Sequence, residues 1–112
     1  MFEIKNGNIY VSRGDAFALN IPVVDEGGAE YTLDPLEKLR FSVYDIDSHR
    51  TISEIHSEGG STRIEVGGND SARWKGRLGF DVKLIYDDGS GDTIVGATPT
   101  HIPRIYVMEV SV

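Results

Sequence analysis

The chain has 112 residues, of which 39% are hydrophobic and 26% charged, values typical of a globular domain rather than of a disordered or fibrous chain. Its 18 acidic residues outnumber 11 Lys and Arg residues, and the resulting net charge of -7 disfavours nucleic acid as a partner. It contains no cysteine, which excludes disulfides, thiolate nucleophiles and cysteine-ligated metal sites. We predict a single domain over residues 1–112.

The N-terminal segment is predicted to form a hairpin over residues 2–12. Apolar residues alternate with polar ones on both sides of Asn6-Gly7, a dipeptide suited to a tight turn. The charges in this segment interrupt its apolar residues, so it lacks the apolar stretch of a signal peptide, and no membrane-length apolar run follows. We expect a protein made in the cytosol without membrane insertion.

The next apolar residues alternate from Phe17 to Val23 and predict a half-buried strand that ends at the turn-prone residues 25–28. Pro22 cannot donate a hydrogen bond, so we expect a free edge or a bulge there. Asp as a cap and Pro at the first helical position make residues 34–37 the only place where a helical turn is expected.

The rest of the chain repeats the alternating pattern, and glycine-rich or acidic segments separate the runs. We predict further strands at residues 39–43, 52–55, 64–66, 78–86, 93–95 and 105–110. Parallel βαβ units would need helices between the strands, and helical spacing is nearly absent. The sequence therefore predicts an all-β fold, an antiparallel Ig-like β-sandwich of about seven to nine strands, favoured over a small barrel.

Three segments carry a family resemblance. Residues 13–19 open the first long strand with Gly14-Asp15, residues 76–84 form the longest strand, and residues 92–96 form the return strand after the turn at 87–89. Together they resemble the small β-sandwich domains of phage tail and baseplate proteins, including the N-terminal domain of baseplate upper proteins of phages of Gram-positive bacteria. In that family a Gly-Asp-aromatic strand start precedes a Gly-x-aromatic-x-aromatic-Asp-hydrophobic strand and a Thr-Ile-x-x-Gly return strand.

The resemblance implies a non-enzymatic structural or assembly protein of a phage or prophage tail or baseplate. Such a protein acts through protein–protein contacts with copies of itself or with other tail proteins, as a virion component made in the bacterial cytoplasm. The alternative, from another class, is a carbohydrate-binding or adhesive β-sandwich module of a bacterial surface.

The C-terminal run supplies the predicted partner interface. Tyr106, Met108 and Val110 alternate with Ile105 and Val107, so both faces of this strand are apolar. A strand covered on one face usually alternates apolar with polar residues, which means that either an intramolecular neighbour or another chain covers the second face. We expect self-association or docking through this strand and through exposed strand edges rather than through a small-molecule cleft.

Trp74 lies between Arg73 and Lys75, just before the longest strand, and two interpretations of it stay open. Its flat ring could stack on a sugar, which would support the carbohydrate-binding alternative. The competing interpretation, which we favour, is an indole that closes the end of the core.

No catalytic, cofactor or metal site is expected from the motifs. Arg13-Gly14-Asp15 leads directly into a strand, which favours a turn over an adhesive loop tip. The acidic residues 87–92 lack the spacing of a calcium loop, and His49, His56 and His101 lack a zinc-binding spacing. The chain also lacks a Gly-x-Ser-x-Gly elbow and a phosphate-binding glycine loop.

Overall fold

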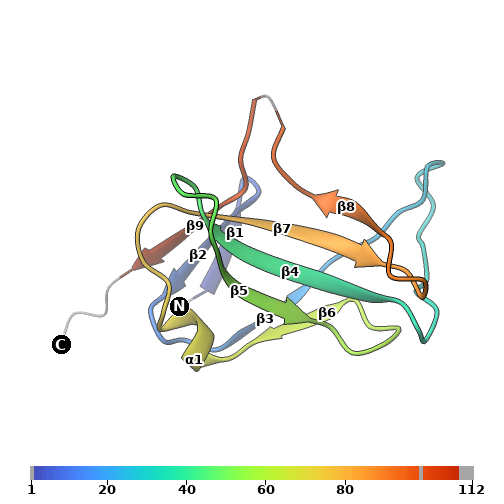
Figure 1. The fold of residues 1–112 in the computed structure, drawn as a ribbon, viewed down its shortest axis with the longest axis horizontal. Coiled ribbons are helices and arrows are strands. Elements are labelled where there is room, and N and C mark those ends of the chain that lie inside the picture. Colours follow the sequence, from blue (N-terminus) through green and yellow to red (C-terminus); the bar gives the residue numbers. More distant parts are fainter. Residues whose placement is uncertain (1, 99, 109–112) are drawn as a thin grey trace.

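The structure is a computed structural model that describes residues 2–98 and 100–108, and it confirms an all-β chain (Figure 1). In chain order the elements are β1 (Phe2–Lys5), β2 (Asn8–Ser12), β3 (Phe17–Asn20), β4 (Lys38–Asp45), β5 (Thr51–His56), β6 (Arg63–Val66), α1 (Gly68–Ser71), β7 (Leu78–Ile85), β8 (Gly91–Val95) and β9 (Arg104–Met108). The predicted N-terminal hairpin is confirmed: β1 and β2 pair in antiparallel register around Asn6 and Gly7, which both have positive φ.

The strands form two sheets. Seven strands make one sheet in the order β1-β2-β9-β7-β4-β5, in which β8 joins by pairing with β7, and β3 with β6 makes a second, two-stranded sheet. Strands β2 and β9 run parallel, with Tyr10 opposite Tyr106, which corrects the prediction of a purely antiparallel fold. Alternation along a strand shows which side chains share a face, but it carries no information on the direction of the neighbouring strand.

Strand β7 holds the large sheet together because three strands pair with it. Along one edge it pairs with the whole of β4, from Lys38↔Ile85 to Asp45↔Leu78. Along the other edge its first residues pair with β9 and its last residues with β8. Between these two stretches the N–H of Phe80 donates to the carbonyl of Pro103 at 3.0 Å. Strands β8 and β9 therefore diverge near Phe80, and the described residues between them, 96–98 and 100–103, project from the body (Figure 1).

One core lies between the two sheets. Phe41 is fully buried at its centre, with its ring centroid 5.6 Å from that of Phe80 and 6.4 Å from that of Trp74. Alternate residues of β4, β6 and β7 face the same cluster, as period-two alternation predicts. The buried apolar residues are Ile9, Val11, Leu19, Val23, Leu33, Leu39, Phe41, Val43, Ile64, Val66, Trp74, Leu78, Phe80, Val82, Leu84 and Ile105.

The prediction of a helical turn at residues 34–37 is wrong. Residues 34–37 form a turn rather than a helix, and the buried carboxylate of Glu37 closes it by accepting a hydrogen bond from the N–H of Asp34 at 2.9 Å. Among residues 2–98 and 100–108 the helical turn lies instead at α1, where the hydroxyl of Ser71 donates to the carbonyl of Asp15 at 2.8 Å. That contact joins residues far apart in the chain, so local sequence patterns do not contain it.

Strand β3 is shorter than the predicted run to Val23. Its ladder with β6 ends at Asn20, after which the N–H of Ile21 still donates to the carbonyl of Thr62 at 3.0 Å. Pro22 follows with no N–H to donate, in agreement with the expected edge position. The described residues also contain no helix with the length and apolar character needed to cross a membrane.

Replacing Phe41 by Ala tests the position of the core. We expect Phe41→Ala to lower the free energy of unfolding by about 3–5 kcal/mol, because it removes a buried ring and leaves a cavity. Leu36→Ala is the matched control, since Leu36 is 76% exposed and its loss should change stability by less than about 0.5 kcal/mol. Urea denaturation followed by circular dichroism measures the stability of both variants. Equal losses of stability would contradict the placement of Phe41 in the core.

Candidate functional site

Strand β9 carries the residues predicted as a partner interface, and the structure divides them between two faces. Ile105 is 2% exposed and belongs to the core, and Val107 is half-buried against it. Tyr106 and Met108 lie on the opposite face, each 37% exposed. The core of the same chain therefore covers one apolar face, which corrects Ile105 and Val107 from interface to packing residues. Val110 lies outside the described residues.

The exposed side of β9 is continuous with β2. Tyr10 lies opposite Tyr106 in the parallel register, and the two rings stack with their centroids 5.0 Å apart and their planes 16° from parallel. The guanidinium carbon of Arg104 lies 5.1 Å from the centre of the Tyr106 ring, close enough for a cation–π contact. We call Tyr10, Arg104, Tyr106 and Met108 the tyrosine face. Its rings are fixed by each other, so little side-chain entropy remains to be lost on binding.

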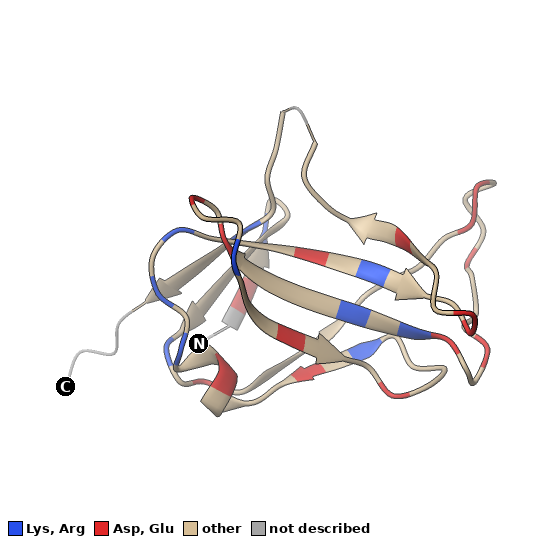
Figure 2. Cartoon of the chain, viewed as in Figure 1, with Lys and Arg blue, Asp and Glu red and all other residues tan. Residues whose placement is uncertain are grey.

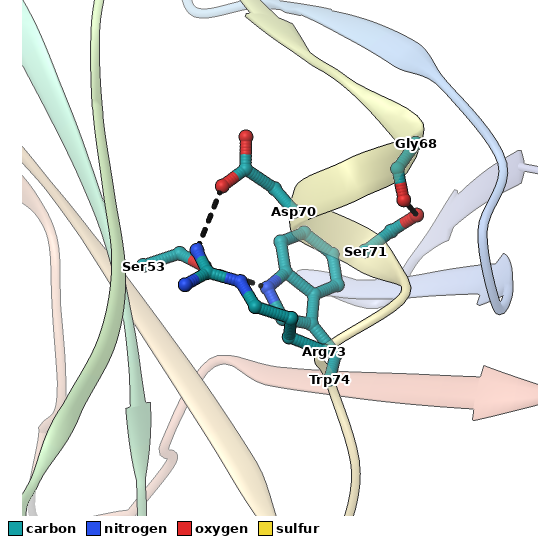
Figure 3. A network of polar contacts seen from close by, with 6 residues as sticks. All are labelled: Ser53, Gly68, Asp70, Ser71, Arg73 and Trp74. Carbon is teal, nitrogen blue, oxygen red and sulfur yellow. Dashed lines mark hydrogen bonds and ion pairs between the residues drawn. The ribbon is translucent and has the colours of Figure 1, made fainter.

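Trp74 is fully buried, and Figure 3 shows its indole among the polar side chains of Ser53, Asp70 and Arg73. Its indole N–H donates to the hydroxyl oxygen of Ser53 at 3.0 Å, while the neighbouring Arg73 forms an ion pair with Asp70 at 3.0 Å. A buried ring presents no face to a ligand, so sugar stacking on Trp74 is wrong as a prediction. The competing interpretation, which places the indole in the core, is confirmed.

An apolar groove of about 450 Å³ opens next to the point where β8 and β9 diverge. Its floor includes the buried side chains of Ile9, Leu19 and Phe80. On its walls, Ile4 is 56% exposed and Val24 is 61% exposed. The full lining is Ile4, Gly7, Ile9, Leu19, Asn20, Ile21, Pro22, Val24, Phe80, Thr93, Ile94 and Val95. We call this the β8 groove.

Charge is distributed unevenly along the molecule. The loops at the end where β4 begins and β7 ends carry many carboxylates, shown in red on the right of Figure 2. These residues are Asp25, Glu26, Glu30, Asp34, Glu37, Glu58, Asp87, Asp88 and Asp92. The opposite end presents basic residues in the loop between α1 and β7, namely Arg73, Lys75 and Arg77. We call the first group the acidic end.

Several carboxylates of the acidic end have internal partners. The hydroxyl of Tyr31 donates to Glu37 at 2.8 Å, and this bond is the main cause that raises the pKa of Tyr31 to about 12. The hydroxyl of Tyr86 donates to Asp92 at 2.6 Å, and the hydroxyl of Ser90 donates to Asp88 at 2.6 Å. These bonds shape the loops, and the negative charges of the carboxylates can still attract a basic group of a neighbouring molecule.

The histidines lie apart from one another. His56 is 3.2 Å from Glu54, whereas His49 lies in the loop after β4 and His101 in the segment before β9. Within residues 2–98 and 100–108, no three His, Asp or Glu side chains gather closely enough to hold a metal ion. Arg13-Gly14-Asp15 forms a turn in which the N–H of Asp15 donates to the carbonyl of Ser12 at 3.1 Å.

A shallow polar hollow lies on the outer face of the large sheet, lined by Arg40, Ser42, Tyr44, His49, Thr51 and Asp81. Burial raises the pKa of Asp81 above its usual range, and the nearby charges of Lys83 and Arg40 oppose the shift. Tyr44 crosses over Gly79 so closely that a Cβ at that position would lie 2.7 Å from the ring. The glycine therefore serves the packing of Tyr44 on the sheet.

The sequence analysis missed Tyr10 and the walls of the β8 groove. Alternation with the buried residues Ile9 and Val11 does place Tyr10 on an outer face. Its stacking on Tyr106 depends on a parallel pairing between the two ends of the chain, and no local signal shows that pairing.

Comparison of the chain with family models, with curated proteins and with solved structures finds no match.

Removing the partner of the indole tests the buried role of Trp74. We expect Ser53→Ala to lower the free energy of unfolding by about 1–3 kcal/mol, because the indole N–H would be buried without its acceptor. Ser48→Ala is the control: the hydroxyl of Ser48 accepts a hydrogen bond from the N–H of Arg50 at 3.3 Å, but the bond is exposed, so water can replace it and the loss of stability should be smaller than for Ser53→Ala. Trp74 fluorescence during denaturation measures the stability of both variants. A Ser53→Ala variant as stable as the wild type would contradict the buried hydrogen bond.

The raised pKa of Asp81 predicts a pH-dependent effect on stability. The folded state binds the Asp81 proton more tightly than the unfolded state, so the group destabilises the fold above its folded pKa, and this cost disappears as the pH falls below its unfolded value. Asp81→Asn should therefore be more stable than wild type at neutral pH, and the difference should shrink towards acidic pH. Thermal melts across pH measure it. A difference that grows as the pH falls would refute this sign.

Proposed function

We propose that this chain is a non-enzymatic assembly protein that acts through protein–protein contacts, as a component of a phage or prophage tail or baseplate. The observation that carries the proposal is the tyrosine face, in which the exposed Tyr106 and Met108 lie beside the half-buried Tyr10 and Arg104 on a well-paired sheet. The family resemblance of residues 13–19, 76–84 and 92–96 supports the phage setting.

The composition of the tyrosine face is that of an interface. Tyr, Met and Arg are enriched at protein interfaces for different reasons. Tyr buries a large area with few rotatable bonds, Met adapts its shape to an irregular surface, and Arg binds through both charge and ring contacts. Tyr106 and Met108 are exposed side by side along β9, and the backbone beneath them is fixed by pairing with β2. A partner that covers this patch therefore gains apolar burial without ordering the strand.

The finer fold is also part of the proposal. We infer that the two sheets correspond to the layers of an Ig-like sandwich, in which the curled edge β1-β2-β9 approaches the small sheet of β3 and β6. The single buried cluster between them supports this arrangement. The parallel pair β2–β9 departs from a purely antiparallel sandwich, since it joins the two ends of the chain in one edge of the sheet.

An assembly role accounts for the surface chemistry better than catalysis does. The polar groups of the loops mostly bond to their own turns, as Asp45 does when it accepts from the N–H groups of Asp47 and Ser48, each at 2.9 Å. These backbone bonds lower the pKa of Asp45, which keeps it charged rather than poised for proton transfer. Among the exposed features, the tyrosine face and the β8 groove are aromatic or apolar, and such surfaces favour binding.

Light scattering over a concentration series tests self-association through the tyrosine face. We expect the average mass of the wild-type protein to rise with concentration, and the variant Tyr106→Ser with Met108→Lys to remain monomeric, because it loses the apolar contact and gains a buried charge at the interface. Leu36→Lys is the control, since it adds the same charge at an exposed site outside the face. A wild-type chain that stays monomeric at about 1 mM would contradict self-association.

A further inference from the structure

The β8 groove has no role in the tyrosine face, and its position next to β8 points to a particular kind of partner. Strand β8 pairs with β7 on one side only, and within the described residues no strand pairs with its other side. An edge of this kind presents unpaired N–H and carbonyl groups, onto which an extended segment of another chain can add as a further strand.

The apolar lining specifies the side chains of such a strand. Ile94 and Val95 of β8 are half-buried, and they line the groove together with Val24, which is 61% exposed. Alternate side chains of a strand added to β8 would face the floor formed by Leu19 and Phe80. Apolar side chains at alternate positions would fill the groove and remove these exposed groups from water.

The charges beside the groove favour a basic partner. Next to the lining, Asp92 precedes Thr93, and Asp25 and Glu26 follow Val24, so these two segments lead into the acidic end (Figure 2). Ile4 is flanked by one acidic and one basic residue, Glu3 and Lys5, so the charges beside the groove are mainly negative. The acidic end of a second copy would meet like charges here, whereas Lys or Arg residues on either side of an apolar strand would meet opposite ones.

We propose that the β8 groove receives an extended segment of a different protein, with apolar residues at alternate positions and Lys or Arg residues flanking them, which pairs with the free edge of β8. The proposal deepens the proposed assembly function and rests on it. It adds a second contact, distinct in place and in chemistry from the tyrosine face.

Selection from a library of random peptides about twelve residues long tests the inference without knowledge of the natural partner. Peptides that bind the wild-type chain should be enriched in alternating apolar residues with basic flanks. Their affinity should fall about tenfold for the double variant Val24→Ser with Ile94→Ser, which removes apolar groove contacts without a change of charge. It should also weaken at high salt, because the flanking charges are screened.

Leu36→Ser is the matched control, since it changes an exposed apolar residue outside the groove and should leave binding unchanged. If the double variant unfolds, Val24→Ser alone serves, because the 61% exposure of Val24 makes it nearly dispensable for the core. Absence of enriched peptides, or enriched peptides that bind wild type and the groove variant equally, would overturn the proposal. Light scattering of the tyrosine-face variant does not depend on peptide binding. A groove that binds no peptide and a chain that does not self-associate therefore give different results.

Discussion

The structure depends on how one edge of β7 is divided between two strands. Strands β8 and β9 both pair with that edge, β9 at Leu78 and Gly79 and β8 from Val82 to Ile85, so neither can extend along the whole of β7. The hydrogen bond from Phe80 to Pro103 marks the boundary. Because the two strands must separate there, the large sheet opens on this side, and the apolar floor beneath it borders a groove instead of another strand.

The same division also explains the tyrosine face. Strand β9 continues past the start of β7 to pair with β2, and this pairing places Tyr106 beside Tyr10 on the outer side of the sheet. The two proposed contact surfaces therefore lie on either side of the position on β7 where β8 and β9 separate, and they differ in their charge. The tyrosine face is an aromatic patch with a positive charge from Arg104, and the β8 groove is apolar beside the acidic end. Under the two proposals, the chain would join copies of itself through one surface and bind a different protein through the other.

Much of the fold could be predicted from the sequence, because period-two alternation fixes which residues of a strand face the core. It located β4 and β7 and the hairpin at Asn6-Gly7. Pairing partners could not be predicted, since the direction and identity of a neighbouring strand depend on contacts between distant residues. The parallel pair of β2 and β9 is the clearest case. The same holds for β9: alternation showed two apolar faces, but not that the core covers the face of Ile105 and Val107. That Tyr106 and Met108 contact a partner stays a prediction.

Amide hydrogen exchange of the free protein, measured residue by residue by NMR, tests the divided edge of β7 most directly. We expect slow exchange for the amides of β4 and of β7, which lie between paired strands, and fast exchange for those amides of β8 that point away from β7. Equally slow exchange for all amides of β8 would show that its outer edge is already paired, and would contradict an open groove.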